Sequence, residues 1–267
     1  MALLRSVIQD ECAFSSAFID LKQIKLTYEL GSRKLEILND LNLRIAEGEF
    51  VCVLGPSGCG KSTLLKILAG YEIPDAGEVI IDGKTHQGPN AEIGVVFQHA
   101  NLFPWLSIEK NVEFGLKMKK MSKTQRRQLV GNYLDMVGLE EFATLLPHQL
   151  SGGMKQRAAI ARSLVMNPKV ILMDEPFAAL DSITRQSIQG QLKQLWQQTN
   201  KTIFFITHDV DEAIFLGSRV ILLNGKPGKV MLDCENPLAS KVKADSDFRD
   251  VEGYKEFRQI LMKALEK

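Results

Sequence analysis

The feature that most constrains the fold is a glycine-rich loop between a short apolar strand and a helix. Residues 55–62 read Gly-Pro-Ser-Gly-Cys-Gly-Lys-Ser and match the G-x-x-x-x-G-K-[ST] pattern at every fixed position. Glu49 to Leu54 has the pattern of a buried strand, and Lys61 to Ala69 has helical spacing before Gly70. Strand, loop and helix in this order predict a phosphate-binding loop in a parallel α/β core.

The chemistry of this loop follows from its residue types. Glycines allow successive backbone N–H groups to face phosphate oxygens, and the N-terminus of the following helix adds its positive dipole end. We expect Lys61 to reach the β- and γ-phosphates, Ser62 to hold Mg²⁺ and Thr63 to bind the α-phosphate. The alternative is a tight glycine-rich turn, but a chance match is expected in only roughly one chain in a hundred of this length. The predicted nucleotide-binding residues here are Gly55, Pro56, Ser57, Gly58, Cys59, Gly60, Lys61, Ser62 and Thr63.

A second candidate site is a pair of acids at the end of an apolar run. Val170 to Met173 precedes Asp174 and Glu175, which places both carboxylates at the C-terminal end of a predicted buried strand, where α/β proteins bind ligands. We expect Asp174 to bind Mg²⁺ and Glu175 to orient or deprotonate the attacking water, while Lys61 offsets phosphoryl charge. The alternative is that Asp-Glu-Pro caps the next helix.

The rest of the chain alternates between strand and helix patterns. Ile19 to Tyr28 and Leu35 to Ile45 predict antiparallel strands around Gly31, and the turn dipeptide Asp82-Gly83 predicts another pair. By contrast, His99 to Val165 is rich in Leu, Met, Lys and Gln and predicts helices. Further along, strand patterns at Val170 to Met173 and Thr202 to Ile206 flank a helical pattern at Ser182 to Gln198, as in a parallel α/β core.

Composition excludes several classes of protein. With 267 residues, of which 45% are hydrophobic, the chain is long enough for one large α/β domain, and its formal net charge of +1 disfavours nonspecific nucleic-acid binding. No apolar run approaches the roughly 20 residues that a bilayer span requires, and no secretory signal begins the chain, so we expect a cytoplasmic protein. The four scattered cysteines fit neither a zinc site nor a disulfide framework.

Residues 150–157, Leu-Ser-Gly-Gly-Met-Lys-Gln-Arg, resemble the signature segment of ABC proteins. Ser151, Gly152 and Gly153 would open a helix and form a second anion site, although an ordinary helix N-cap is the alternative. The resemblance implies a homodimer of two cassettes facing head to tail, in which each signature completes the ATP site of the other copy. The fifth residue, Met154, departs from the more familiar glutamine.

Four further residues resemble family positions in the same order along the chain. The resemblance implies that Tyr28 stacks on adenine, that Gln98 reaches Mg²⁺ or the attacking water, that Asp181 links the two ATP sites, and that His208 contacts the γ-phosphate. Each residue alone would more often be structural, and Tyr28 would be an ordinary strand-end tyrosine. Their shared order favours the family interpretation.

The resemblance implies an α/β fold with a P-loop NTPase (RecA-like) core, an antiparallel β subdomain and an inserted helical subdomain. We expect an N-terminal extension at 1–17, the cassette at 18–235 with helices at about 99–165, and a helical tail at 236–267. In the tail, Val251, Tyr254, Phe257, Ile260, Leu261 and Leu265 would form one apolar helix face that packs on the cassette, with a regulatory or partner-docking role as the alternative.

The same resemblance implies an ATPase that drives uptake through two transmembrane permease subunits, supplied by a solute-binding protein, on the inner face of the plasma membrane. Phe103 and Trp105, in the apolar segment Asn101 to Leu106, are candidate docking residues, with burial as the alternative. Gly88-Pro89, Leu102 to Trp105, and Leu223 to Val230 with its Gly-Lys-Pro-Gly resemble importers of the nitrate, sulfonate and taurine group, although no residue here specifies the cargo. The rival functions are a soluble ABC ATPase and a non-hydrolysing regulatory subunit.

Overall fold

The structure is a computed structural model that describes residues 17–31, 33–242 and 248–266. Almost all of the expected N-terminal extension lies outside these ranges. The chain divides into two compact units: one contains the described residues up to Asn90 and from Trp196 onward, and the other runs from Ala91 to Leu195. Each unit is described by itself.

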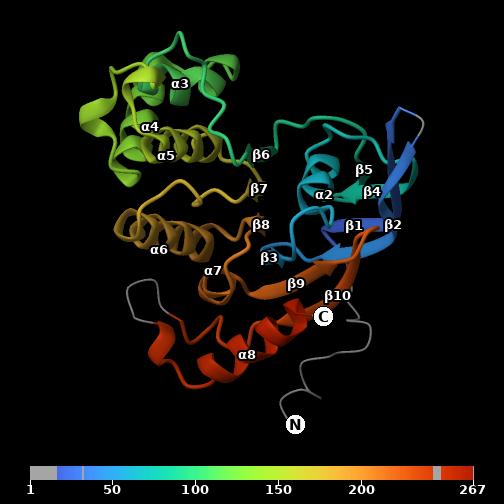
Figure 1. Cartoon of the computed structure of the whole chain (residues 1–267). Coiled ribbons are helices and arrows are strands. Elements are labelled where there is room, and N and C mark those ends of the chain that lie inside the picture. The colour runs from blue at the N-terminus through green and yellow to red at the C-terminus, as the bar shows by residue number, and fades with distance from the viewer. Residues whose placement is uncertain (1–16, 32, 243–247, 267) are drawn as a thin grey trace. The chain divides into compact units, whose positions relative to one another are not determined.

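The first unit contains an antiparallel sheet of four strands in the order β2-β1-β4-β5 (Figure 1). As predicted, the second pair of strands turns at Asp82-Gly83, where both residues have positive φ angles, of 51° and 69°. This is the backbone that a two-residue hairpin turn requires. The strands are β1 (Ile19–Leu30), β2 (Arg33–Ile45), β4 (Ala76–Ile81) and β5 (Lys84–Thr85).

The same unit contains four strands of a second sheet. β3 is parallel to both β8 and β9, and β10 is antiparallel to β9. All five residues of β3 and of β8 are buried, as expected for apolar strands of a parallel core. The elements are β3 (Phe50–Leu54), α2 (Lys61–Leu68), β8 (Thr202–Ile206), α7 (Val210–Leu216), β9 (Arg219–Asn224) and β10 (Lys229–Glu235).

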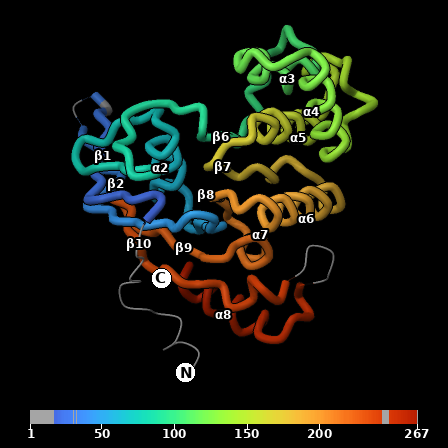
Figure 2. The backbone as a smooth tube through the Cα atoms, turned by 180° about the vertical axis from the view of Figure 1, so that it is seen from behind, coloured from blue at the N-terminus to red at the C-terminus, as the bar shows by residue number. Residues whose placement is uncertain are grey.

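The C-terminal tail packs on this unit through an apolar face, as predicted. After η3 (Phe248–Asp250), α8 (Tyr254–Leu265) lies beside α7 and β9 (Figure 2) and buries Tyr254, Phe257 and Leu261. Tyr254 Oη and Arg258 Nε each donate to Asp211 Oδ1 in the first turn of α7, at 2.8 Å. The tail is therefore fastened to α7 by both apolar and polar contacts.

The second unit has a parallel strand pair and a set of helices. The predicted helical stretch contains three α-helices, and Ser107 and Ser122 cap the first two through their side chains. No described helix contains an apolar run of bilayer-spanning length. The elements are β6 (Ile93–Val96), α3 (Ile108–Met118), α4 (Lys123–Met136), η1 (Glu140–Phe142), η2 (Pro147–Gln149), α5 (Gly152–Leu164), β7 (Val170–Asp174) and the start of α6 (Ser182–Thr199).

Candidate functional site

The glycine-rich loop joins β3 to α2, and its backbone accepts only glycine at two key positions. Gly55 and Gly60 have φ angles of 151° and 96°. A Cβ atom on Gly55 would lie 2.1 Å from the carbonyl oxygen of Leu223, and one on Gly60 would lie 2.8 Å from Leu38 Cδ2. Only glycine fits at these two positions, because the neighbouring strands leave no room for a side chain and the φ angles favour glycine.

Lys61, the first residue of α2, turns its ammonium back into the loop. Its Nζ donates to the carbonyl oxygens of Gly55 at 2.7 Å and Pro56 at 2.9 Å, and only 7% of the residue is exposed. The lysine charge is therefore held inside the curve of the loop, among the backbone groups that the sequence assigns to phosphate binding.

His208 lies at the same sheet edge as the loop. Val53 of β3 pairs with Ile206 of β8 in the parallel register, so Gly55 and His208 each follow the carboxyl end of one of two neighbouring strands. The buried Thr207 between them donates its backbone N–H to the Val53 carbonyl oxygen at 3.2 Å. The exposed His208 side chain thus projects from a fixed backbone.

A capped turn follows His208 and starts α7. Asp209 Oδ1 accepts from the N–H groups of Asp211 and Glu212, and Thr207 Oγ1 donates to Glu212 Oε2 at 2.6 Å. An acceptor side chain three residues ahead of a glutamate is the local signal that could have predicted this helix from the sequence.

Tyr28, Ser62 and Thr63 complete the candidate residues of the first unit. The Tyr28 hydroxyl donates to Glu72 Oε2 at 3.3 Å. Burial and the nearby Glu72 carboxylate raise the pKa of Tyr28, whereas a hydrogen bond with Thr63 lowers it by a smaller amount than burial raises it. Tyr28 and Thr63 are half-buried, whereas Ser62 is exposed. The tyrosine is therefore close to the helix that carries Lys61, beside the loop.

In the second unit, Gln98 and Glu175 meet beyond the ends of two paired strands. Val96 of β6 pairs with Met173 of β7, so the two candidate side chains each follow two residues later. Gln98 Nε2 donates to Glu175 Oε2 at 3.3 Å. Glu175 has a φ of 44°, in the left-handed region that non-glycine residues adopt at some energetic cost, often at functional sites. Asp174, the last residue of β7, is half-buried beside it in the chain.

The signature residues form the exposed start of α5. Ser151 is the N-cap, and its Oγ accepts from the Met154 N–H at 3.2 Å. A Cβ on Gly152 would have no atom of the described residues within 4 Å, whereas one on Gly153 would lie 3.0 Å from the Ala179 carbonyl oxygen. The helix N-terminus therefore presents open backbone donors on one side and packs on residues 179–180 on the other.

Asp181 follows that contact and caps α6. Its Oδ1 accepts from the Thr184 N–H at 3.0 Å, and this hydrogen bond is the largest cause of its lowered pKa. Gly153 meets Ala179 and Leu180, so the signature and Asp181 are neighbours within this unit.

Sequence reasoning missed two signature-helix residues that organise this unit. Gln156, only 2% exposed, donates through Nε2 to the Phe97 carbonyl oxygen at 2.8 Å, next to Gln98. Arg157 Nη1 donates to the carbonyl oxygens of Val137 and Gly138 at the end of α4. Both partners are distant in sequence, so no local pattern could have revealed them.

The donor set of the loop fits a polyphosphate rather than an isolated metal ion. Lys61, the glycine backbone and the start of α2 supply positive groups around one curve. Within the described ranges, no three His, Cys, Asp or Glu side chains gather to hold a metal. A site of this kind suits Mg²⁺, which commonly binds through one or two protein oxygens together with substrate phosphates.

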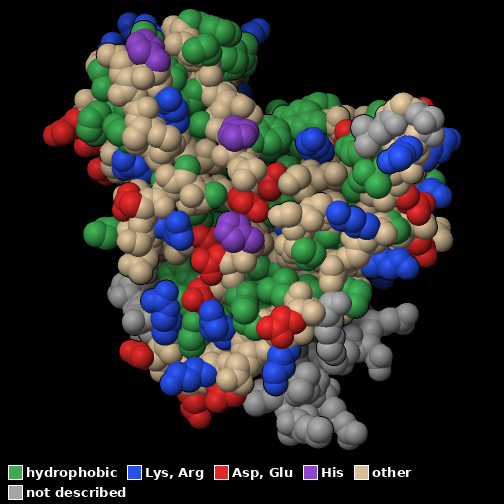
Figure 3. Space-filling view, in the orientation of Figure 1, with side chains coloured by type: hydrophobic (Ala, Val, Ile, Leu, Met, Phe, Trp, Pro, Cys, Tyr) green, Lys and Arg blue, Asp and Glu red, His purple; other side chains and the backbone are tan. Residues whose placement is uncertain are grey.

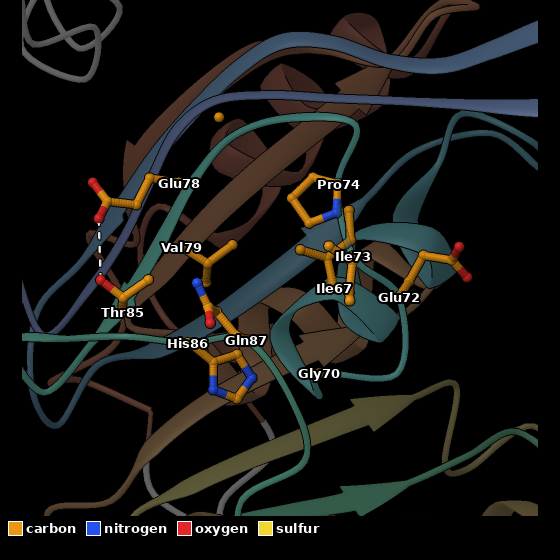
Figure 4. Close-up of a pocket in the computed structure, with 11 residues that line it drawn as sticks. Ile67, Gly70, Glu72, Ile73, Pro74, Glu78, Val79, Thr85, His86 and Gln87 are labelled. Atoms are coloured by element: carbon orange, nitrogen blue, oxygen red, sulfur yellow. Dashed lines mark hydrogen bonds between the residues drawn. The ribbon is translucent and has the colours of Figure 1, made fainter.

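A separate pocket of about 390 Å³ lies in the first unit, where the end of α2 meets β4 and β5 (Figure 4). Ile67, Pro74 and Val79 supply apolar walls, and burial lowers the pKa of His86 at one side. None of its lining residues belongs to the predicted site.

Figure 3 shows acidic and basic side chains interspersed over the visible face, in keeping with the near-zero net charge.

The apolar segment before α3 is partly packed and partly exposed. Phe103 lies 4.6 Å from Phe114 between ring centroids, and the fully buried Asn111 binds the backbone on both sides of the Phe103 peptide. Trp105 is 73% exposed. Phe103 is therefore partly buried by packing within this unit, whereas most of the Trp105 side chain is exposed.

A family model described as ABC transporter matches residues 38–178. The taurine import ATP-binding protein TauB of Pseudomonas aeruginosa is 44% identical over 237 residues, which cover 89% of this chain and 90% of TauB. The nitrate import ATP-binding protein NrtD of Synechocystis is 50% identical over 193 residues, covering 72% and 73%. Among solved structures, the dimeric ATP-binding cassette MJ0796 with ADP and Pi has a TM-score of 0.76 at 41% identity, covering 82% of this chain and 98% of that one.

Proposed function

This chain belongs to the ABC transporter family, with relatives among the nitrate and taurine importers, and we propose that it is the ATP-hydrolysing subunit that drives such an importer. Its fold is the P-loop ABC ATPase fold. In this proposal the cassette spans 18–235, with a helical subdomain at about 99–165 and a tail at 236–267. ATP and Mg²⁺ are its cofactors.

The observation that carries the proposal is the Glu175 carboxylate. The residue is held in a left-handed backbone conformation at the end of a buried strand and accepts a hydrogen bond from Gln98. A carboxylate fixed in this way is suited to orient and deprotonate an attacking water.

The phosphate groups would be bound by residues 55–63 and Lys61, with Tyr28 against the base and His208 near the terminal phosphate. Mg²⁺, held by Ser62, Asp174 and Gln98, would supply charge neutralisation for the phosphate oxygens. The buried Lys61 ammonium, already within the loop, would exchange its bonds to the Gly55 and Pro56 carbonyl oxygens for bonds to phosphate oxygens.

We further propose a head-to-tail homodimer in which Ser151 to Gly153 of one copy face the ATP bound by the other. The open space around Gly152 and the exposed start of α5 support an occupant from outside the chain. MJ0796, a related cassette, is described as dimeric. Asp181, next to the signature, would then lie at the same dimer interface.

The transport partners are two permease subunits, fed by a solute-binding protein, with this chain on the inner face of the plasma membrane. The exposed Trp105 ring, packed at 5.7 Å from Phe103, supports a docking role, since exposed aromatic side chains often anchor interfaces. The solute in this proposal is of the nitrate, sulfonate or taurine type, and the names of TauB and NrtD, which print taurine and nitrate, support it.

Substituting Glu175→Gln tests the hydrolytic assignment. We expect ATP affinity to be retained, steady-state hydrolysis to fall by roughly 100-fold or more because the base is removed, and an ATP-bound dimer to accumulate. The measurements are phosphate release, nucleotide binding and size-exclusion chromatography. Glu141→Gln, an exposed glutamate of the same unit, is the matched control. Hydrolysis at the original rate in Glu175→Gln would falsify the role of Glu175.

Two rival functions give different results in simple experiments. A soluble ABC ATPase would recover no membrane protein when the chain is purified from a detergent extract of its own cells. A non-hydrolysing regulatory subunit would bind ATP but release no phosphate in the presence of its membrane partners. The importer proposal predicts co-purification of two permease subunits and phosphate release.

A further inference from the structure

The four-residue turn between β9 and β10, Gly225-Lys226-Pro227-Gly228, packs on the phosphate loop. A Cβ on Gly228 would lie 2.0 Å from the Cys59 carbonyl oxygen, and the Gly228 N–H donates to the Ile37 carbonyl oxygen at 2.8 Å. One strand earlier in this hairpin, the Leu223 carbonyl oxygen lies against Gly55. The turn therefore packs on Cys59 of the loop, and β9 packs on Gly55.

The side chain of Lys226 is placed by this packing. Its Cε and Nζ lie 3.3 Å and 3.4 Å from where a Cβ of Gly58 would be, which puts the ammonium against the middle of the loop. Gly58 has a φ of 82°, which favours glycine, and the end of the Lys226 side chain lies over the space beside its Cα atom. Lys226 is exposed.

Resting on the nucleotide-binding role proposed above, we propose that Lys226 is a second cation of the nucleotide site, which attracts the polyphosphate from its position beside Gly58. Lys61 at Gly55 and Pro56 and Lys226 at Gly58 then place two positive charges against one loop. A lysine ammonium is a compact point charge on a flexible stem, suited to a polyanion whose oxygens it need not contact in one fixed geometry. The ligand class is a nucleoside di- or triphosphate.

The test compares Lys226→Gln with Lys229→Gln. Lys229 is an exposed lysine at the start of β10 on the same hairpin, and its substitution removes the same charge. We expect Lys226→Gln to raise the Kd for ATP about fivefold, corresponding to about 1 kcal/mol, and to flatten the salt dependence of Kd, because a screened charge interaction is lost. Lys229→Gln should change the Kd by less than about 1.5-fold.

Two further arms separate a charge effect from a packing effect. Lys226→Arg should keep ATP affinity within about twofold of the original, because the charge remains. The Kd for AMP should change less than that for ATP in Lys226→Gln, because AMP carries fewer phosphates.

Equal ATP affinities of Lys226→Gln and Lys229→Gln would overturn the proposal. So would an equal loss for AMP and ATP that Lys226→Arg does not restore, since the lysine would then act by covering Gly58. Absence of ATP binding in the unaltered chain would instead contradict the proposed function itself, so the two failures are distinguishable.

Discussion

Segment 55–60 precedes α2 in the first unit, and segment 151–153 begins α5 in the second. The two glycine-bearing segments differ in the atoms that surround them. In the first, side chains on Gly55 and Gly60 would collide with Leu223 and Leu38 of the same unit. In the second, a side chain on Gly152 would meet no described atom within 4 Å. The fold therefore explains why Gly55 and Gly60 lack side chains, whereas no described residue excludes a side chain at Gly152.

The largest effect is expected at Gly60, where fold and function depend on the same residue. Gly60→Ala should lower the free energy of unfolding by about 1–3 kcal/mol, because φ is 96° and the new Cβ overlaps Leu38. ATP binding should be lost with it. Thermal unfolding and nucleotide titration measure both quantities.

Gly83→Ala is the matched control for Gly60, since its φ is also positive, at 69°, but its surroundings are open. It should cost only about 1–2 kcal/mol and leave ATP binding unchanged. A Gly60→Ala protein that binds ATP normally would show that the loop tolerates a side chain.

At Gly152 the effects on fold and function should separate. Gly152→Glu should change stability by no more than about 0.5 kcal/mol, because the position is open and a carboxylate suits a helix N-terminus. Hydrolysis should fall by roughly 100-fold, because the added charge would repel a phosphate bound there. Phosphate release and thermal unfolding are the measurements.

The control for Gly152 is Gly131→Glu in α4, where a Cβ also meets nothing within 4 Å. This variant should hydrolyse ATP at the original rate. If Gly152→Glu unfolds as readily as Gly60→Ala, the contrast between the two segments is wrong; if it hydrolyses normally, the anion site at α5 is wrong.

The smallest effect is expected at the helix cap itself. Ser151→Ala should cost about 1 kcal/mol of stability, because the acceptor for the Met154 N–H is lost. Ser151→Asp should restore the cap but not hydrolysis, because it places a negative charge where the proposal puts a phosphate. Chemical denaturation and phosphate release test both variants.

Ser122→Ala provides the reference for that cap, because Ser122 accepts from the Gln125 N–H in α4. Its stability loss should match that of Ser151→Ala while hydrolysis is unaffected. Recovery of full hydrolysis in Ser151→Asp would reduce Ser151 to an ordinary N-cap.

The sequence predicted those features that local patterns determine. β3, the loop and α2 follow from an apolar run and three glycines, and the Asp82-Gly83 hairpin follows from its turn dipeptide. The tail helix was also predicted from its apolar face, although Val251 lies before α8 rather than within it. In each case residues close together in the sequence determine the secondary structure.

What escaped the sequence depends on contacts between distant positions. The Gly228 contact with Cys59 and the Gln156 bond to Phe97 join segments more than fifty residues apart. The glycine and lysine of the β9–β10 turn resembled a family feature, but only the packing of the turn on the loop suggested a physical role.

The pairing of β3 has a consequence for synthesis of the chain. Phe50 to Val53 pair with Ile203 to Ile206, so this apolar strand has no parallel neighbour from β8 until more than 150 further residues have been translated. At ordinary rates of elongation that interval lasts on the order of 10–30 s. During it this apolar strand lacks both of its native neighbours, β8 and β9, and apolar segments left unpaired in this way favour aggregation of a nascent chain.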